Sequence, residues 1–156
     1  MGQATKTQAI EPVRKALTIK LAPARAFRLF TEEIAKWWPL ATHSVGGMQA
    51  ETVVFEGRVG GRIYERHRNG KTADWGTIRV WAPPQRVVFS WHPGRGDDAA
   101  QEVEVRFTVA GCGTLVELEH RGWEKLGKDA AKTRDNYDQG WNLVFGDHYG
   151  KAAGVG

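Results

Sequence analysis

The five histidines are the residues of this sequence best suited to acid–base or metal chemistry. An imidazole changes charge near neutral pH and is a common metal ligand. No two of them have the spacing of a metal-ligand pair: His43, His67, His92, His120 and His148. The single cysteine cannot supply a thiolate cluster. The sequence contains neither a glycine-rich phosphate loop nor a nucleophile elbow. It therefore predicts no metal site and no cofactor.

Two of these histidines are predicted to point into the interior. His120 alternates with Val116 and Leu118 along a strand pattern, and His148 falls on the apolar face of the last helix pattern. Each could be a buried neutral imidazole with a hydrogen-bond partner. Each could instead anchor a ligand or act as a general base. Both interpretations stay open, and no catalytic residue is assigned.

Tryptophan is the unusual component of the composition, with seven Trp against three Tyr. A tryptophan is large and carries an N–H group that needs a partner when it is buried. Five of them could be core residues or the wall of an apolar cavity: Trp38, Trp75, Trp91, Trp123 and Trp141. These roles overlap, because apolar pockets are lined by such residues together with a few polar anchors.

The stretch 129–151 has the periodicity of one long amphipathic helix, with Asp129 as its N-cap. Gly140 and Gly146 lie inside this stretch, and they indicate close packing, room for a ligand, or simple tolerance. At about 100° per residue, its apolar face collects Ala130, Thr133, Arg134, Tyr137, Trp141, Val144, Phe145 and His148.

The chain upstream of this helix reads mainly as strands that are joined by short turns. Alternation and turn residues predict strands over 13–21, 52–56, 62–68, 73–82, 86–92, 102–109 and 114–121. Within 102–109 the alternation places Val103, Val105, Phe107 and Val109 inward and Glu104 outward. Residues 22–38 form two short helices that end before Pro39. The prediction is an α+β fold: a curved antiparallel sheet of six to seven strands wrapped around a long C-terminal helix.

The length of 156 residues suits one domain. Residues 1–12 are expected to be a disordered arm and 13–152 a single domain. One cysteine and no apolar signal core predict a cytoplasmic protein, and no apolar run reaches the length of a membrane span. The net charge of +4 is spread along the chain without a basic run, which argues against a nucleic-acid partner.

Several motifs are similar to those of the activator of heat-shock protein 90 ATPase homologue family. They are 75–78 (WGTI), 83–91 (PPQRVVFSW), 119–123 (EHRGW), Trp37-Trp38-Pro39, Gly60-Gly61-Arg62 and Arg134-x-x-Tyr137-x-x-Gly140-Trp141. The resemblance covers roughly residues 13–150. It implies the helix-grip fold of the START-like, or SRPBCC, superfamily, with a hydrophobic cavity between the sheet and the C-terminal helix. Members of that superfamily bind lipids, polyketides and other apolar molecules, and some cyclise polyketides.

The resemblance and the aromatic content together predict a small soluble protein that binds an apolar or aromatic small molecule in that cavity. The alternatives are a polyketide cyclase or aromatase that uses His120 or an acid as proton shuttle, and a chaperone-interacting module of the stress response. The expected state is a monomer or weak homodimer without a membrane span or nucleic-acid partner. The predicted ligand-binding residues are Trp38, Phe55, Trp75, Phe89, Trp91, Phe107, His120, Tyr137, Trp141, Phe145 and His148.

Overall fold

A seven-stranded antiparallel sheet forms the body of the protein in the computed structural model, which describes residues 10–154. Its strands lie in the order β1-β7-β6-β5-β4-β3-β2, so that only β1 and β7 are neighbours from distant parts of the chain. The predicted antiparallel sheet is confirmed, with strand ends within two residues of the expected ones. The bounds are β1 (Val13–Ile19), β2 (Ala50–Phe55), β3 (Arg62–His67), β4 (Thr72–Ala82), β5 (Arg86–Trp91), β6 (Gln101–Ala110) and β7 (Gly113–Arg121).

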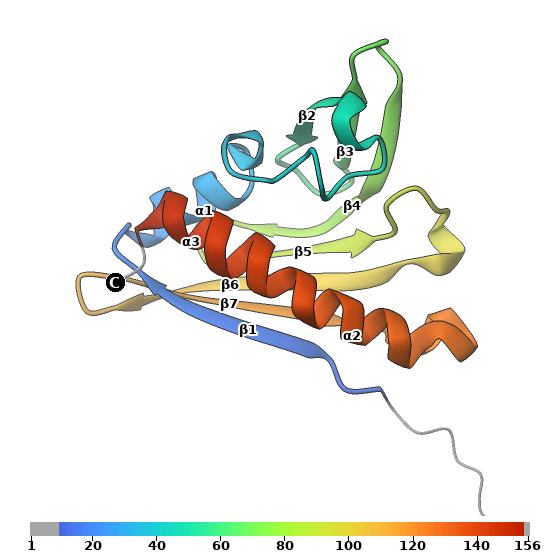
Figure 1. Cartoon of the computed structure of the whole chain (residues 1–156). Coiled ribbons are helices and arrows are strands. Elements are labelled where there is room, and N and C mark those ends of the chain that lie inside the picture. Colours follow the sequence, from blue (N-terminus) through green and yellow to red (C-terminus); the bar gives the residue numbers. More distant parts are fainter. Residues whose placement is uncertain (1–9, 155–156) are drawn as a thin grey trace, which may run out of the picture.

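One long helix crosses the sheet near the C-terminus, as expected (Figure 1). It runs without interruption through α2 (Ala130–Trp141), a π-helical segment η5 (Asn142–Tyr149) and α3 (Gly150–Ala153). The two short helices after the first strand are α1 (Pro23–Phe30) and the 3-10 turn η1 (Ile34–Lys36). The remaining 3-10 turns are η2 (Gly47–Gln49), η3 (Asp97–Ala99) and η4 (Trp123–Asp129).

The π-helical segment changes which residues of the long helix face the sheet. The predicted face is correct from Ala130 to Phe145, but the next fully buried side chain is Tyr149 and His148 is only half-buried. A π-helix has more residues per turn than an α-helix. Tyr149, four residues after Phe145, therefore stays on the inner face, whereas His148, three residues after Phe145, turns away from it. The Tyr149 ring stacks on Phe145 at 5.6 Å, and its hydroxyl donates to the carbonyl oxygen of Ala26 at 2.9 Å.

Aromatic side chains fill the interior beneath α1 and the end of the long helix. Phe107 of β6 meets the rings of Phe27 and Phe30 at centroid distances of 5.2 and 6.3 Å. Phe30 also meets Phe145 and Tyr149. This end of the molecule is packed core, so little space remains there for a ligand.

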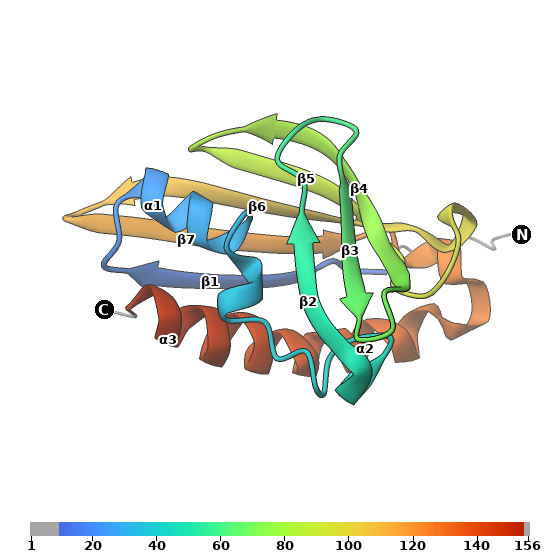
Figure 2. The same ribbon diagram turned by 90° about the horizontal axis from the view of Figure 1, so that it is seen from above.

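One of the inward and outward assignments on β6 was wrong. Val109 was predicted inward but is 70% exposed, because it lies near the tip of the β6–β7 hairpin, which extends past the helices (Figure 2). Glu104 points outward as predicted, but it is only 5% exposed. Three arginines cover it on the outer face of the sheet: Arg86, Arg106 and Arg121.

The start of the described chain lies against the long helix. Arg134 donates from Nε to the carbonyl oxygen of Glu11 at 3.0 Å and from Nη2 to that of Pro12 at 3.1 Å. Ile10 packs on the core. Residues 1–9 of the expected arm lie outside the described residues. Over the range 10–154, no helix is long and apolar enough to cross a membrane.

Candidate ligand-binding site

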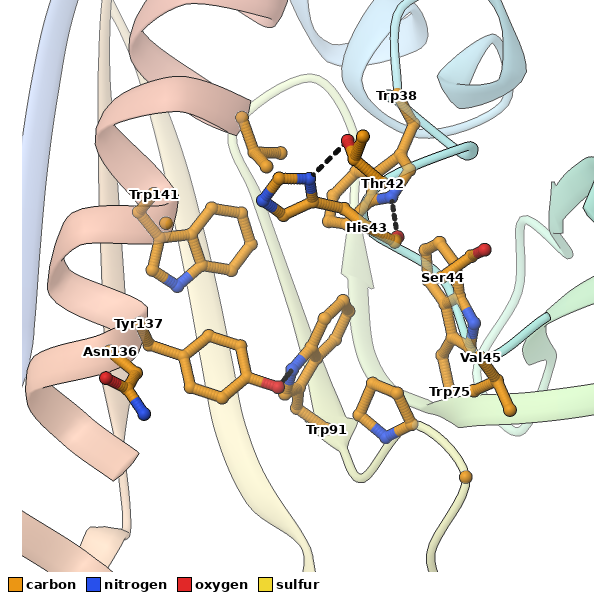
Figure 3. A pocket seen from close by; sticks show the side chains of 14 residues that line it. Trp38, Thr42, His43, Ser44, Val45, Trp75, Trp91, Asn136, Tyr137 and Trp141 are labelled. Carbon is orange, nitrogen blue, oxygen red and sulfur yellow. Dashed lines mark hydrogen bonds between the residues drawn. The ribbon is translucent and has the colours of Figure 1, made fainter. Parts of the chain in front are cut away.

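A cavity of about 440 Å³ opens between the long helix, the ends of β4 and β5, and the loop that follows η1 (Figure 3). Its volume falls in the usual range for small-molecule sites. Fourteen residues line it: Trp38, Thr42, His43, Ser44, Val45, Trp75, Trp91, Pro93, Gly94, Asn136, Tyr137, Gly140, Trp141 and Val144.

Four tryptophans form the walls of the cavity. Trp38 comes from the end of the η1 region, Trp75 from β4, Trp91 from β5 and Trp141 from α2. The ring of Trp38 lies 4.9 Å from Trp75 and 5.9 Å from both Trp91 and Trp141, measured between centroids. Trp91 and Trp141 are also 5.9 Å apart. Four separate segments of the chain thus supply one continuous aromatic surface.

Glu65 of β3 fixes the loop that carries His43, Ser44 and Val45. This carboxylate is fully buried, and both of its oxygens accept hydrogen bonds. Oε1 accepts from the backbone N–H of Val45 at 2.8 Å and from Trp75 Nε1 at 2.6 Å. Oε2 accepts from the backbone N–H of Gly46 at 2.7 Å and lies 2.6 Å from His67 Nε2. One side chain therefore ties the loop to a wall of the cavity.

The charge of Glu65 is stable in this setting. Burial raises the pKa of a carboxyl group, but hydrogen bonds from Trp75, Val45, Gly46 and His67 outweigh it, so the pKa of Glu65 is lowered. The backbone at position 46 approaches the side chains of Glu65 and His67 closely, and this favours glycine. A Cβ there would lie 2.7 Å from His67 Nε2 and 3.2 Å from Glu65 Oε2. The Glu65 carboxylate is thus a permanent acceptor for the loop.

Few polar groups reach the cavity. The hydroxyl of Tyr137 lies 3.1 Å from Trp91 Nε1, and the Nδ1 atom of His43 lies 2.8 Å from the hydroxyl of Thr42. The Ser44 hydroxyl is engaged with the carbonyl oxygen of Leu40 at 2.6 Å. Burial and the nearby His148 lower the pKa of His43, which keeps its imidazole neutral at pH 7. None of the fourteen lining residues is Asp, Glu, Lys or Arg.

His120 lies behind the cavity wall and is fully buried. Trp141 donates from Nε1 to His120 Nδ1 at 3.0 Å, and His120 Nε2 lies 3.2 Å from Gln101 Oε1. Because an indole nitrogen can only donate, Nδ1 must be an acceptor and the proton sits on Nε2. Burial lowers the pKa of His120 to about 3. This environment matches the buried neutral imidazole and leaves no lone pair for a general base.

The predicted site residues divide into two groups in the structure. Trp38, Trp75, Trp91, Tyr137 and Trp141 line the cavity. The other six do not line it: Phe55, Phe89, Phe107 and Phe145 lie in the aromatic core, His120 lies behind Trp141, and His148 is half-buried on η5. Trp123, the other candidate wall residue, is fully buried, and its ring lies tilted against His120 at a centroid distance of 4.1 Å.

Sequence reasoning missed the part of the site that comes from irregular segments. Thr42, His43, Ser44 and Val45 belong to a loop that has no periodicity, and Pro93 and Gly94 follow β5. Their only sequence signal was position, because a loop that follows Trp37-Trp38 and contains two glycines is a plausible binding segment. Gly140 and Gly146 have open space beside them: a Cβ on either would meet no atom within 4 Å outside the helix's own backbone. Close packing therefore does not explain them.

The comparison with family models gives one match. The model of the family described as activator of Hsp90 ATPase homolog 1-like protein matches residues 20–148, most of the chain. The chain belongs to this family. No curated protein sequence matches it.

Solved structures with the same fold include three that differ in what they are named for. CV1439 from Chromobacterium violaceum is 17% identical with a TM-score of 0.64, covering 92% of this chain and 98% of its own. Txn09, named as an anthrahydroquino-γ-pyrone synthase, is 32% identical with a TM-score of 0.58, covering 83% and 88%. CalC from Micromonospora echinospora, named as a self-sacrificing resistance protein, is 26% identical with a TM-score of 0.61, covering 92% and 96%. The helix-grip fold predicted from the sequence is confirmed.

Within residues 10–96 and 98–154, no three His, Cys, Asp or Glu side chains are grouped closely enough to hold a metal ion. The site offers aromatic surface and a small number of neutral polar groups.

Proposed function

We propose that this protein binds an apolar or aromatic small molecule in the cavity between Trp38, Trp75, Trp91 and Trp141. The observation that carries the proposal is the cavity itself, because about 440 Å³ of space is walled by four indole rings from four segments. Aromatic rings pair through offset or edge contacts at centroid distances of roughly 4.5–7 Å. A flat aromatic molecule can make such contacts with several walls at once.

The proposal is tested by filling the cavity from the helix. Gly140 lines the cavity and Gly146 does not, although both lie in the same helix with open space beside them. Gly140→Phe should weaken binding of fluorene, an uncharged tricyclic arene, by about tenfold or more, because overpacking a site costs roughly 1–3 kcal/mol. Gly146→Phe is the matched control and should bind fluorene as the wild type does.

The measurement is quenching of tryptophan fluorescence during a fluorene titration, with melting temperatures to verify that both variants fold. No saturable binding to the wild type would contradict the proposal. Equal binding by the two variants would show that fluorene occupies another place.

An enzymatic role in the same cavity is the second candidate. It is supported by Txn09, the 32% identical protein named as a synthase, and by His43, a neutral imidazole on the cavity wall that can accept a proton. A general base in the cavity would speed the exchange of the α-protons of 1-tetralone for deuterium in D₂O, which NMR follows. Exchange no faster than in buffer would count against an enzymatic role. A chaperone partner stays a prediction without support from the described residues.

A further inference from the structure

Tyr137 has a hydrogen-bond donor that no described residue uses. Its hydroxyl oxygen lies 3.1 Å from Trp91 Nε1. The indole N–H can only donate, so the phenol oxygen must accept this bond and its own proton points elsewhere. Among residues 10–96 and 98–154, no acceptor is within hydrogen-bond reach of that proton, and Tyr137 lines the cavity. The phenol therefore offers a donor to whatever the cavity holds.

The direction of this phenol is fixed by its neighbours. The ring of Tyr137 meets the edge of His120 at a centroid distance of 4.9 Å and lies 5.5 Å from Trp123. His120 is itself held between Gln101 and Trp141. Figure 3 shows the Tyr137 side chain reaching from α2 to Trp91 across the cavity. Burial raises the pKa of Tyr137, so the phenol keeps its proton at neutral and mildly basic pH.

The rest of the lining carries no charge at neutral pH. None of the fourteen lining residues is Asp, Glu, Lys or Arg, and His43 is kept neutral. Moving an ion from water to an apolar wall without an opposite charge costs much desolvation free energy, whereas an uncharged molecule loses little. Arg95, which follows the lining residue Gly94, acts on Tyr137 through its charge from outside the lining. A carboxylate or ammonium group on the ligand would find no opposite charge among the fourteen lining residues and is therefore disfavoured in the interior of the cavity.

We propose that the cavity selects an uncharged aromatic carbonyl compound and that the Tyr137 hydroxyl recognises it by donating a hydrogen bond to the carbonyl oxygen. This inference rests on the proposed binding of an aromatic molecule. It adds the functional group of the ligand, a carbonyl, and the residue that binds it, Tyr137. The Trp91 indole completes the arrangement, because it donates to one lone pair of the phenol oxygen and leaves the phenol proton for the ligand.

The test uses two probes of the same shape, 9-fluorenone with a carbonyl group and fluorene without one. Tyr137→Phe keeps the ring and removes only the hydroxyl. It should weaken 9-fluorenone binding by about 3- to 10-fold, the value of one hydrogen bond, and leave fluorene affinity within about twofold. Tryptophan fluorescence gives both affinities, because the substitution removes no tryptophan, and the melting temperature reports on folding.

A second pair of probes tests the rejection of charge. The 4-carboxamide and 4-carboxylate of 9-fluorenone have nearly the same shape but differ in charge, and the carboxylate should bind wild-type protein at least about tenfold more weakly.

The possible outcomes separate this inference from the proposed function. Suppose that fluorene binds and that Tyr137→Phe changes the affinity for both probes equally or for neither. This result would overturn the role of Tyr137 and leave the proposed function standing. Equal binding of carboxamide and carboxylate would overturn the selection against charge. Binding of neither fluorene nor 9-fluorenone to the wild type would overturn the proposed function and the inference together.

Discussion

At His120 the two ring nitrogens have different partners, and this difference fixes a wall of the cavity. Nδ1 accepts from Trp141, while Nε2 donates to Gln101. Gln101 in turn donates from Nε2 to the carbonyl oxygen of Ala99 at 2.6 Å. The indole of Trp141 is therefore held in one orientation from behind, while its face lines the cavity. His120 acts on the site as a positioning residue.

The buried state of His120 predicts a pH dependence of stability. Its pKa is about 3 in the folded protein, below the ordinary value of 6.5. The unfolded chain therefore takes up a proton that the folded protein does not, and stability that is complete above pH 6.5 is lost as the pH falls toward 3. The loss from this one group should be roughly 1 kcal/mol per pH unit.

His120→Gln removes the titration but can keep both hydrogen bonds, with its amide oxygen facing Trp141 and its NH₂ group facing Gln101. Urea denaturation between pH 6.5 and 4.5 should show a flatter loss of stability for this variant than for the wild type. His43→Gln is the comparison. His43 is only half-buried, so its lowered pKa should contribute less to the pH dependence of stability than that of His120. Parallel pH curves for wild type and His120→Gln would contradict the assignment.

At the scale of elements, periodic patterns were predictable and the loop around His43 was not. Strands such as β7 bury one face, so Val116, Leu118 and His120 could be assigned inward from their alternation. The long helix was predictable for the same reason up to Phe145. The π-helical segment η5, which ends at Tyr149, packs Phe145 on Phe30 and bonds the Tyr149 hydroxyl to Ala26, and no local pattern encodes these contacts.

The loop from Leu40 to Gly47 takes its conformation from a distant residue. Glu65 lies two residues from Ile63 on β3, and both face inward, but a carboxylate in that position gives no sign of the four groups it will contact. The loop is also closed from its other side, because Trp38 donates from Nε1 to the carbonyl oxygen of His43 at 2.6 Å. Four of the fourteen cavity residues depend on these long-range contacts.

Glu65→Gln should loosen this loop. An amide NH₂ group cannot accept, so at least one of the donors that now meet the carboxylate would be left without an acceptor, at a cost of about 1–3 kcal/mol in the free energy of unfolding. Amide hydrogen exchange at Val45 and Gly46 should become faster. The control is Glu51→Gln on β2, which loses only an exposed ion pair with Arg66 at 3.5 Å and should change stability by less than about 1 kcal/mol. Unchanged exchange at Val45 and Gly46 would contradict the role given to Glu65.

Over the whole molecule, the sheet has an aromatic inner face and an outer face of paired charges. The cavity needs the curved sheet to hold β4 and β5 at a set distance from the helix. On the outer face, Glu104 connects three neighbouring strands. It accepts from Arg86 Nε of β5 at 2.6 Å, from Arg106 Nε of β6 at 2.7 Å and from Arg121 Nη1 of β7 at 2.7 Å. Burial opposes ionisation, but these three hydrogen bonds lower the pKa of Glu104 to about 2.

Glu104→Gln should therefore destabilise the fold at pH 7 by roughly 2–4 kcal/mol, because three guanidinium groups lose a buried carboxylate. Glu117→Gln is the matched control on the same face, since Glu117 is exposed. The stabilisation by Glu104 is complete above the ordinary carboxyl pKa of 4.5 and is lost as the pH falls toward 2. The difference between wild type and Glu104→Gln in urea denaturation should thus shrink as the pH is lowered from 5 toward 2. A difference that is within about 0.5 kcal/mol at pH 7, as for an ordinary surface substitution, would show that the outer face does not hold the strands together.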